Sequence, residues 1–254
     1  MPDFRLLIDP PAAGAWNMAV DEALLETATA DGVATLRFYG WEEPTLSLGY
    51  FQSAAERDQH PASRRCPLVR RASGGGAILH DRELTYSVAI PQRGTSLCAA
   101  RDLYDAFHET LLATLGELGI AAELYRVAAA NCLGNPESGV GQQPFLCFQR
   151  RTCSDIVYNG AKIVGSAERR RRGVVLQHGS VLLAKSRFAP ELPGIEELAG
   201  QSISPAELMT GWKRRLANRL RVSFCEGELP PEDQRRAQWL LRDRFAAADY
   251  LQRR

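Results

Sequence analysis

Residues 70–81 read Arg70-Arg71-Ala72-Ser73-Gly74-Gly75-Gly76-Ala77-Ile78-Leu79-His80-Asp81. Three consecutive glycines stand here between a short apolar run at 67–69 and an alternating run that contains Leu84, Tyr86 and Val88. Glycine loses more backbone entropy on ordering than any other residue, so three in a row are unsuited to the interior of a strand or a helix. We therefore expect this backbone either to adopt positive φ angles or to lie directly against a ligand.

We call residues 71–77 the glycine loop, and two interpretations of it are open. Peptide N–H groups exposed by such a turn, with Arg70 and Arg71 beside them, can bind an anion or the oxyanion of a reacting carbonyl group. The alternative is a hairpin turn with exposed arginines, because short glycine motifs are weak signals by themselves.

The composition is typical of a globular protein rather than a disordered or membrane-spanning one. The chain has 254 residues, of which 45% are hydrophobic and 24% charged, with a formal net charge of +1. Without a strong basic excess we expect no nucleic-acid partner and no membrane partner. No run reaches the roughly 20 apolar residues of a membrane span, and the first residues do not resemble a signal peptide. We therefore expect a cytoplasmic protein.

The cysteines form no recognisable metal or disulfide pattern. They are Cys66, Cys98, Cys132, Cys147, Cys153 and Cys225. No pair has the spacing of a zinc site, so we predict no metal ligands and no disulfide framework. In a reducing cytosol all six should be free thiols, most of them small residues of the core.

Hydrophobic periodicity and turn residues predict an α+β domain with mainly antiparallel sheets. The first predicted helix covers 16–25 with Asn17 as its N-cap, and strands at 36–39 and 45–50 are expected to pair. Asn159-Gly160 favours a tight type I′ turn between strands at 155–158 and 161–167. Ser204, Pro205 and Glu207 predict the start of a helix that ends near residue 220. Further strands are predicted at 85–90, 123–127 and 174–183, helices at 100–118 and 231–251, and a long functional or mobile loop at 128–146.

Five segments resemble, in the expected order, the signatures of the lipoate-protein ligase A and protein octanoyltransferase superfamily. They are residues 17–22, 46–52, 70–81, 160–167 and 177–183. The resemblance implies a biotin/lipoate protein ligase-like catalytic domain, an α+β fold with mainly antiparallel sheets flanked by helices. We place this catalytic core at residues 1–190 and expect residues 191–254 to be a C-terminal helical extension packed on it.

Within the superfamily, ligases use ATP to form an acyl-adenylate, whereas transferases carry a cysteine nucleophile and need no ATP. The position of Cys147 resembles that of the nucleophile in LipM-type octanoyltransferases, and residues 80–88 also resemble those enzymes more than typical ligases. Only helices are predicted after residue 190, whereas many ligases append a second small domain. The resemblance therefore favours transfer of an octanoyl group from octanoyl-acyl carrier protein to a lipoyl-domain lysine, without a cofactor.

The acceptors implied are lipoyl domains of 2-oxo acid dehydrogenases or the glycine cleavage H protein. Three alternatives stay open. The chain could be a lipoate-protein ligase that requires ATP and Mg²⁺, an enzyme that moves octanoyl between lipoyl domains, or a non-catalytic acyl-binding relative.

The expected catalytic pair is Cys147 and Lys162. Lys162 follows the predicted turn one hairpin away, where its charge would favour the Cys147 thiolate. Either Lys162 or His80 could accept the proton of the acceptor lysine, and Cys153 is a second candidate nucleophile. The predicted substrate-binding residues are Arg71, Ser73, Gly74, Gly75, Gly76, Ala77, His80, Gly165 and Ser166, with backbone N–H groups near 74–77 or 165–166 receiving the oxyanion.

Structural interpretations compete with each of these roles. Lys162 could be a solvent-facing guard of a strand edge, Cys147 a buried core residue, and His80 and His178 hydrogen-bonded structural residues. For the charge run at 168–173 the structural interpretation is a solvated loop, and the functional hypothesis is that this run, with Arg150 and Arg151, steers an acidic carrier toward the site. Leu and Phe residues of the early strands could line an acyl slot or simply pack in the core.

Overall fold

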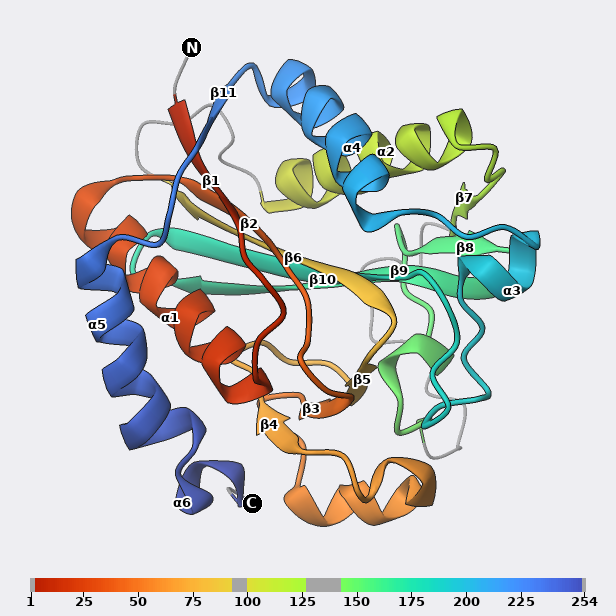
Figure 1. The fold of residues 1–254 in the computed structure, drawn as a ribbon, viewed down its shortest axis with the longest axis horizontal. Coiled ribbons are helices and arrows are strands. Elements are labelled where there is room, and N and C mark those ends of the chain that lie inside the picture. The colour runs from red at the N-terminus through yellow and green to blue at the C-terminus, as the bar shows by residue number, and fades with distance from the viewer. Residues whose placement is uncertain (1–2, 93–99, 127–142, 253–254) are drawn as a thin grey trace.

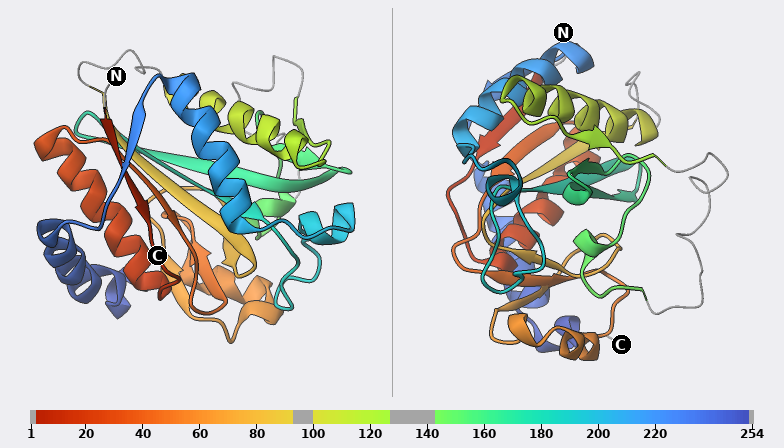
Figure 2. Two further views of the ribbon diagram at one scale, coloured as in Figure 1. Left: turned by 45° about the horizontal axis from the view of Figure 1, so that its top comes forward. Right: turned by 90° about the vertical axis from the view of Figure 1, so that its right-hand side faces the viewer.

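The computed structural model describes residues 3–92, 100–126 and 143–252. In these residues a large, mainly antiparallel sheet has helices on both faces, and a small sheet lies beside it (Figure 1; Figure 2). The predicted α+β fold class is confirmed. Among the described helices, none is long and apolar enough to cross a membrane.

Within the described residues the large sheet contains eight strands. In spatial order these are β11 (Ser223–Glu226), β1 (Asp3–Ile8), β2 (Thr35–Tyr39), β6 (Glu83–Pro91), β10 (Val174–Leu182), β9 (Ala161–Arg171), β8 (Ile156–Tyr158) and β7 (Glu123–Leu124). β1 is parallel to both of its neighbours, and the other pairs are antiparallel. The central strands β6 and β10 are buried on both faces, and their buried residues include polar ones such as Thr85, Ser87 and Gln177 as well as apolar ones.

The small sheet holds the glycine loop. Its strands, in order, are β4 (Leu68–Arg70), β3 (Thr45–Leu48) and β5 (Ile78–His80). β4 and β5 flank the glycine loop, so both ends of the loop are fixed by pairing with β3. The predicted pairing of strands 36–39 and 45–50 is wrong. β2 pairs with β1 and β6 in the large sheet, while β3 belongs to the small one.

Helices cover the large sheet on both sides, as Figure 2 shows. They are α1 (Gly14–Asp31), α2 (Ala100–Glu117), α3 (Ile195–Ala199), α4 (Pro205–Leu220), α5 (Pro231–Leu240) and α6 (Ala248–Leu251). α2 and α4 pack in one hydrophobic core with the sheet, and α1 and α5 pack in another. Leu103, Phe107, Leu111 and Leu115 of α2 are fully buried, so the helix predicted from their spacing is confirmed.

Two predicted helix features are wrong. α1 begins at Gly14, so Asn17 lies inside the helix instead of capping it. Its buried amide donates to the carbonyl oxygen of Gly40 at 2.9 Å and accepts from Arg37 at 2.9 Å. The helix predicted at 231–251 is interrupted after Leu240, where a π-helical turn covers Leu241–Phe245. The helix at 205–220 is confirmed, although Ser204 forms no side-chain cap hydrogen bond.

The hairpin that carries Lys162 is as predicted. Asn159 and Gly160 have φ angles of +48° and +77°, as a type I′ turn requires. β9 then continues to Arg171, so the loop predicted for the charge run at 168–173 is wrong, and only Arg172 and Gly173 form the turn before β10. β7 accounts for the start of the predicted strand at 123–127. Most of the predicted loop at 128–146 lies outside the described residues.

Residues beyond 190 contribute both to the large sheet and to the helices that cover it. The prediction that only helices follow residue 190 is wrong, because β11 extends the large sheet next to β1. α4 packs against α2, and α5 packs against α1. The division of the chain into a catalytic core and an extension stays a prediction.

Candidate active site

The candidate site is a cavity of about 310 Å³ between the glycine loop and strands β9 and β10. Nine of the predicted site residues line it, namely Arg71, Gly74, Gly75, Gly76, His80, Cys147, Lys162, Gly165 and Ser166. Ser73 and Ala77 do not. The apolar part of the lining includes Met18, Tyr39, Ile78 and Phe148.

Arg71 holds the glycine loop in shape. Its guanidinium donates to the carbonyl oxygens of Gly74 and Gly76, both at 2.7 Å, and to that of Ser47 at 3.1 Å. These bonds turn the loop carbonyls toward Arg71, and Gly75 adopts a φ of +92°. Among the described residues, the N–H groups of Gly74, Gly75 and Gly76 have no hydrogen-bond partner. They are therefore free to receive an oxyanion.

Cys147 is tied directly to this loop. The Cys147 N–H donates to the Ala77 carbonyl oxygen at 2.7 Å, and the Ala77 N–H donates to the Phe145 carbonyl oxygen at 3.0 Å. The predicted role of Ala77 as an oxyanion donor is therefore wrong, because its N–H is already engaged. A Cβ placed on Gly75 would lie 3.8 Å from Cys147 Sγ and 3.0 Å from Arg71 Nη2, so sulfur and guanidinium face the same space over Gly75.

The cysteines are not all free. Cys66, Cys147 and Cys225 are free, with Cys147 half-buried. Cys153 is disulfide-bonded, which corrects the prediction that all six are thiols. In this form Cys153 has no thiol to act as the alternative nucleophile. Sequence spacing could not reveal the bond, because disulfides depend on distances set by the tertiary fold. The remaining two cysteines lie outside the described residues.

Lys162 is buried and paired. Its Nζ lies 2.9 Å from Asp155 Oδ2 and 5.4 Å from the centre of the Phe148 ring. The interpretation of Lys162 as a solvent-facing guard residue is therefore wrong. Its side chain passes over Gly165, where an added Cβ would lie only 2.4 Å from Lys162 Cε. A glycine at 165 is what lets the lysine reach into the cavity.

Asp155 is a functional candidate that the sequence analysis missed. Its Oδ2 also accepts from the Thr152 N–H at 2.7 Å and from Thr152 Oγ1 at 3.1 Å. Asp155 thus links Lys162 to the segment that follows Cys147. A carboxylate directly before an apolar strand, in a chain with only three lysines, was the available signal.

His80 has protein partners on both ring nitrogens. Nε2 is hydrogen-bonded to Ser47 Oγ at 2.9 Å and Nδ1 to Glu83 Oε1 at 2.7 Å, while the ring stacks on Trp41 at 3.8 Å. Both ring nitrogens of His80 are therefore already hydrogen-bonded to protein groups, although its ring lines the cavity. Of the two predicted proton acceptors, Lys162 is an ammonium paired with Asp155, so the basic group of that pair is the Asp155 carboxylate.

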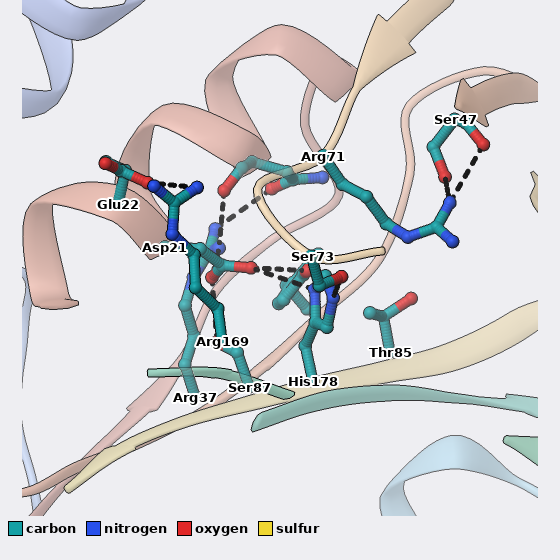
Figure 3. A network of polar contacts seen from close by, with 12 residues as sticks. Asp21, Glu22, Arg37, Ser47, Arg71, Ser73, Thr85, Ser87, Arg169 and His178 are labelled. Atoms are coloured by element: carbon teal, nitrogen blue, oxygen red, sulfur yellow. Dashed lines mark hydrogen bonds and ion pairs between the residues drawn. The ribbon is translucent and has the colours of Figure 1, made fainter. Parts of the chain in front are cut away.

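Ser73 anchors the glycine loop to β10 through His178 (Figure 3). Ser73 Oγ is hydrogen-bonded to His178 Nε2, and His178 Nδ1 lies 4.0 Å from Asp21 Oδ2. Burial lowers the pKa of His178 to about 4, although Asp21 opposes this, so the imidazole is neutral at pH 7. Ser73 therefore holds the glycine loop in place without lining the cavity, and the structure gives no support to its predicted contact with substrate.

Ser166 is also held from behind. Its hydroxyl is hydrogen-bonded to His108 Nε2 at 2.6 Å and to the Tyr86 hydroxyl at 2.7 Å. Burial lowers the pKa of His108 to about 4. Neutral His108 therefore bonds Ser166 through Nε2 and the Ser154 carbonyl oxygen through Nδ1, at 2.6 Å.

Two further predictions need correction, namely that the charge run at 168–173 is solvated throughout and that Leu and Phe residues of the early strands line an acyl slot. Arg169 and Arg171, in the charge run, face the buried carboxylate of Glu22, with N–O distances of 4.0 and 2.7 Å. Arg170 and Arg172 are exposed.

Leu and Phe residues of the early strands do not line the cavity and instead pack in the hydrophobic cores. Among the described residues, no group of His, Cys, Asp and Glu side chains is arranged to hold a metal ion.

Comparison with known proteins identifies the family. Residues 13–189 match the family model described as lipoyl protein ligase A/B catalytic domain. Octanoyltransferase LipM from Brevibacillus brevis is 32% identical over 279 residues, which cover 100% of both chains. Octanoyltransferase LipM from Moorella thermoacetica is 35% identical over 263 residues, 94% of this chain and 93% of the relative.

Solved structures share the fold. A lipoate-protein ligase A bound with ATP has a TM-score of 0.77 and 22% identity, with 99% of each chain covered. A bipartite lipoate protein ligase from Thermoplasma acidophilum, described with its E2 lipoyl domain, has a TM-score of 0.75 and 19% identity, with 99% of this chain and 97% of that chain covered. The family model and the full-length relatives agree with the fold and with the resemblance of the five segments: the chain belongs to the lipoyl protein ligase A/B catalytic domain family.

Proposed function

We propose that this protein is an octanoyl-[acyl carrier protein]:protein N-octanoyltransferase of lipoate biosynthesis, in which Cys147 carries the acyl group. The protein is an enzyme of a family whose full-length relatives are named octanoyltransferases, so octanoyl transfer is the activity that similarity supports. The observation that carries the proposed mechanism is that Cys147, Lys162 and the glycine loop border one cavity.

In the first half-reaction the Cys147 thiolate attacks the carbonyl carbon of the octanoyl thioester on the carrier. The tetrahedral oxyanion would be received by the unpaired N–H groups of Gly74–Gly76, since the Cβ position of Gly75, in the middle of this run, lies 3.8 Å from the sulfur. Collapse of this intermediate breaks the bond to the carrier thiol, which leaves as a thiolate and takes a proton. The acyl group is then a thioester of Cys147.

In the second half-reaction a lipoyl-domain lysine attacks this thioester as a neutral amine. An amide forms, the C–S bond breaks, and the Cys147 thiolate is regenerated. The proton released by the amine must be accepted near the sulfur, and we assign that role to the Asp155 carboxylate, because the Lys162 ammonium paired with it is already fully protonated. One thioester is exchanged for another and then for an amide, so the reaction uses no ATP and no metal ion.

The cavity also suits an acyl chain. Met18, Ile78 and Phe148 supply apolar surface in the same cavity that Cys147 borders. The donor and acceptor in this proposal are octanoyl-acyl carrier protein and a lipoyl domain of a 2-oxo acid dehydrogenase or the glycine cleavage H protein. We place this reaction in the cytoplasm.

The test is an intact-mass measurement after incubation with octanoyl-acyl carrier protein in the absence of ATP. We expect a hydroxylamine-labile octanoyl adduct that is lost in Cys147→Ala and kept in Cys225→Ala, which changes an exposed free cysteine. A lipoyl domain added next should receive the octanoyl group. Modification that requires ATP and free lipoate, or an adduct that survives in Cys147→Ala, would overturn the proposal.

A further inference from the structure

The charge of Arg71 is not neutralised by any described carboxylate. The side chain is 2% exposed, and its hydrogen bonds go to the carbonyl oxygens of Ser47, Gly74 and Gly76 and to Ser47 Oγ. Among the residues that the structure describes, no carboxylate lies within ion-pair distance of it, and its Nε has no hydrogen-bond partner. A buried guanidinium with only neutral partners is costly.

Lys162, in contrast, belongs to a closed ion pair. Its ammonium and the Asp155 carboxylate are both buried, with 2.9 Å between Nζ and Oδ2. Seen from Cys147, the opposite charges of this pair largely cancel. The pair is therefore a weaker source of positive potential than an uncompensated arginine at similar distance.

The other ionisable side chains around the cavity do not take the place of Arg71. On β10, His178 is neutral at pH 7, and on β2 burial raises the pKa of Tyr39. On β5, His80 is bonded to the Glu83 carboxylate. Arg150 follows Cys147, but it is partly exposed to solvent, where water screens its charge.

We propose that Arg71 is the residue that stabilises the Cys147 thiolate, while the Lys162–Asp155 pair is used to handle protons. The inference rests on the proposed function, since it assumes that the Cys147 thiolate is the nucleophile. It changes the predicted role of Arg71, which was substrate binding, and that of Lys162, which was thiolate stabilisation.

The electrostatics of Arg71 agree with this assignment. Burial lowers the pKa of Arg71 to about 10. The nearby charge of Arg150 lowers this pKa further, whereas the attraction between Arg71 and Cys147 raises it. Attraction between two charges is mutual, so a guanidinium favoured by the thiolate also favours the thiolate. The glycine at 75 makes this possible, because a side chain there would come between the two groups.

The test follows alkylation of Cys147 by iodoacetamide as a function of pH, with the Cys147 peptide quantified by mass spectrometry. Only the thiolate reacts, so the midpoint of the profile reports its stability. Arg71→Met should move the midpoint up by about one pH unit or more. Arg71→Lys, which keeps the charge but loses the planar fork, should stay much closer to the wild type. A purely structural role in holding the loop would make both variants shift alike.

Two further variants separate the sources of charge. Asp155→Asn combined with Lys162→Met removes the ion pair as a unit and should leave the midpoint within a few tenths of a pH unit. Arg70→Met removes the neighbouring buried arginine, which bonds the carbonyl oxygens of Gly49, Gln52 and Tyr250 and does not line the cavity, and should also leave it unchanged.

The inference is overturned if the double variant, or Arg150→Met, shifts the midpoint as much as Arg71→Met. It is also overturned if Arg71→Lys and Arg71→Met shift it equally. If Arg71→Met does not fold, a shift of about one pH unit or more in the double variant or in Arg150→Met overturns the inference, and so does a shift of that size in Arg71→Lys. Because alkylation needs no acyl donor, these outcomes are independent of whether Cys147→Ala abolishes the acyl-enzyme adduct.

Discussion

Lys162 Nζ lies 2.9 Å from Asp155 Oδ2, and the two side chains are 4% and 1% exposed. The lysine comes from β9, whereas the aspartate precedes β8 and is held by the N–H and hydroxyl groups of Thr152. Desolvation of two charges offsets much of their attraction, so such a pair adds little net stability. We therefore attribute the presence of the Lys162–Asp155 pair to its position at the cavity, which Lys162 lines, and not to a gain in stability.

Asp155→Asn should destabilise the fold by about 3 kcal/mol, because it leaves the Lys162 ammonium buried without a countercharge. Urea denaturation measures the free energy of unfolding. Glu117→Gln is the control, since it removes a carboxylate that pairs with Arg214 and Arg215 at the surface, and it should cost less than about 1 kcal/mol. Adding Lys162→Met to Asp155→Asn should recover part of the loss. Equal costs for the two single variants would contradict this account.

Gly165→Ala should reduce octanoyl transfer about a hundredfold, because the new methyl group would displace the Lys162 side chain that passes over residue 165. The measurement is kcat for transfer to a lipoyl domain. Gly116→Ala is the matched control, since nothing lies within 4 Å of the added Cβ and residue 116 is exposed within α2. That change should leave transfer unaltered and add about 0.5–1 kcal/mol of stability. Normal kcat in Gly165→Ala would show that Lys162 does not need its present position.

Stability should fall as the pH is lowered from about 6.5 to about 4, in part because of His108. Its pKa in the folded protein is lowered to about 4 by burial, whereas an unfolded histidine titrates near 6.5. Between these values the unfolded chain binds a proton that the folded protein excludes, so acid favours unfolding. The loss is on the order of 3 kcal/mol and is complete below about pH 4.

The measurement is the free energy of unfolding of the wild type and of His108→Gln at pH 7 and pH 4.5. The variant should be less stable than the wild type at pH 7, because it loses hydrogen bonds to Ser154 and Ser166. Its stability should nevertheless depend less on pH over this interval. The same drop in both proteins would exclude His108 as a source of the pH dependence.

Arg170→Glu combined with Arg172→Glu should lower kcat/KM for an acidic carrier protein about tenfold at low salt, and the difference should vanish at high salt. These two arginines are exposed, so reversal of their charge should leave the melting temperature unchanged. Arg171→Glu is the contrasting variant. It places a carboxylate against buried Glu22, which Arg171 contacts at 2.7 Å, and should destabilise the fold. If rates and salt dependence are unchanged in the double variant, these arginines do not steer the carrier.

Local features of the fold could be predicted because they depend on neighbours along the chain. The spacing of Leu103, Phe107, Leu111 and Leu115 identifies α2 from helical periodicity alone, and Asn159-Gly160 specifies a turn through the φ angles that these residues tolerate. Asn17 shows the limit of such reasoning. It has the chemistry of an N-cap, but its amide is used by Arg37 and Gly40, partners brought to it by the sheet.

The sequence by itself determined the family, the glycine loop, and the presence of a cysteine and a lysine close to one hairpin. Only the tertiary structure decided which charges cancel. Asp155 neutralises Lys162, while Arg71 is left with carbonyl partners beside the sulfur. Propensity and turn chemistry act over a few residues, whereas the field at a buried atom is set by groups that packing brings together from distant segments. That is why the residues of the site could be named from the sequence, while their division of labour had to be inferred from the fold.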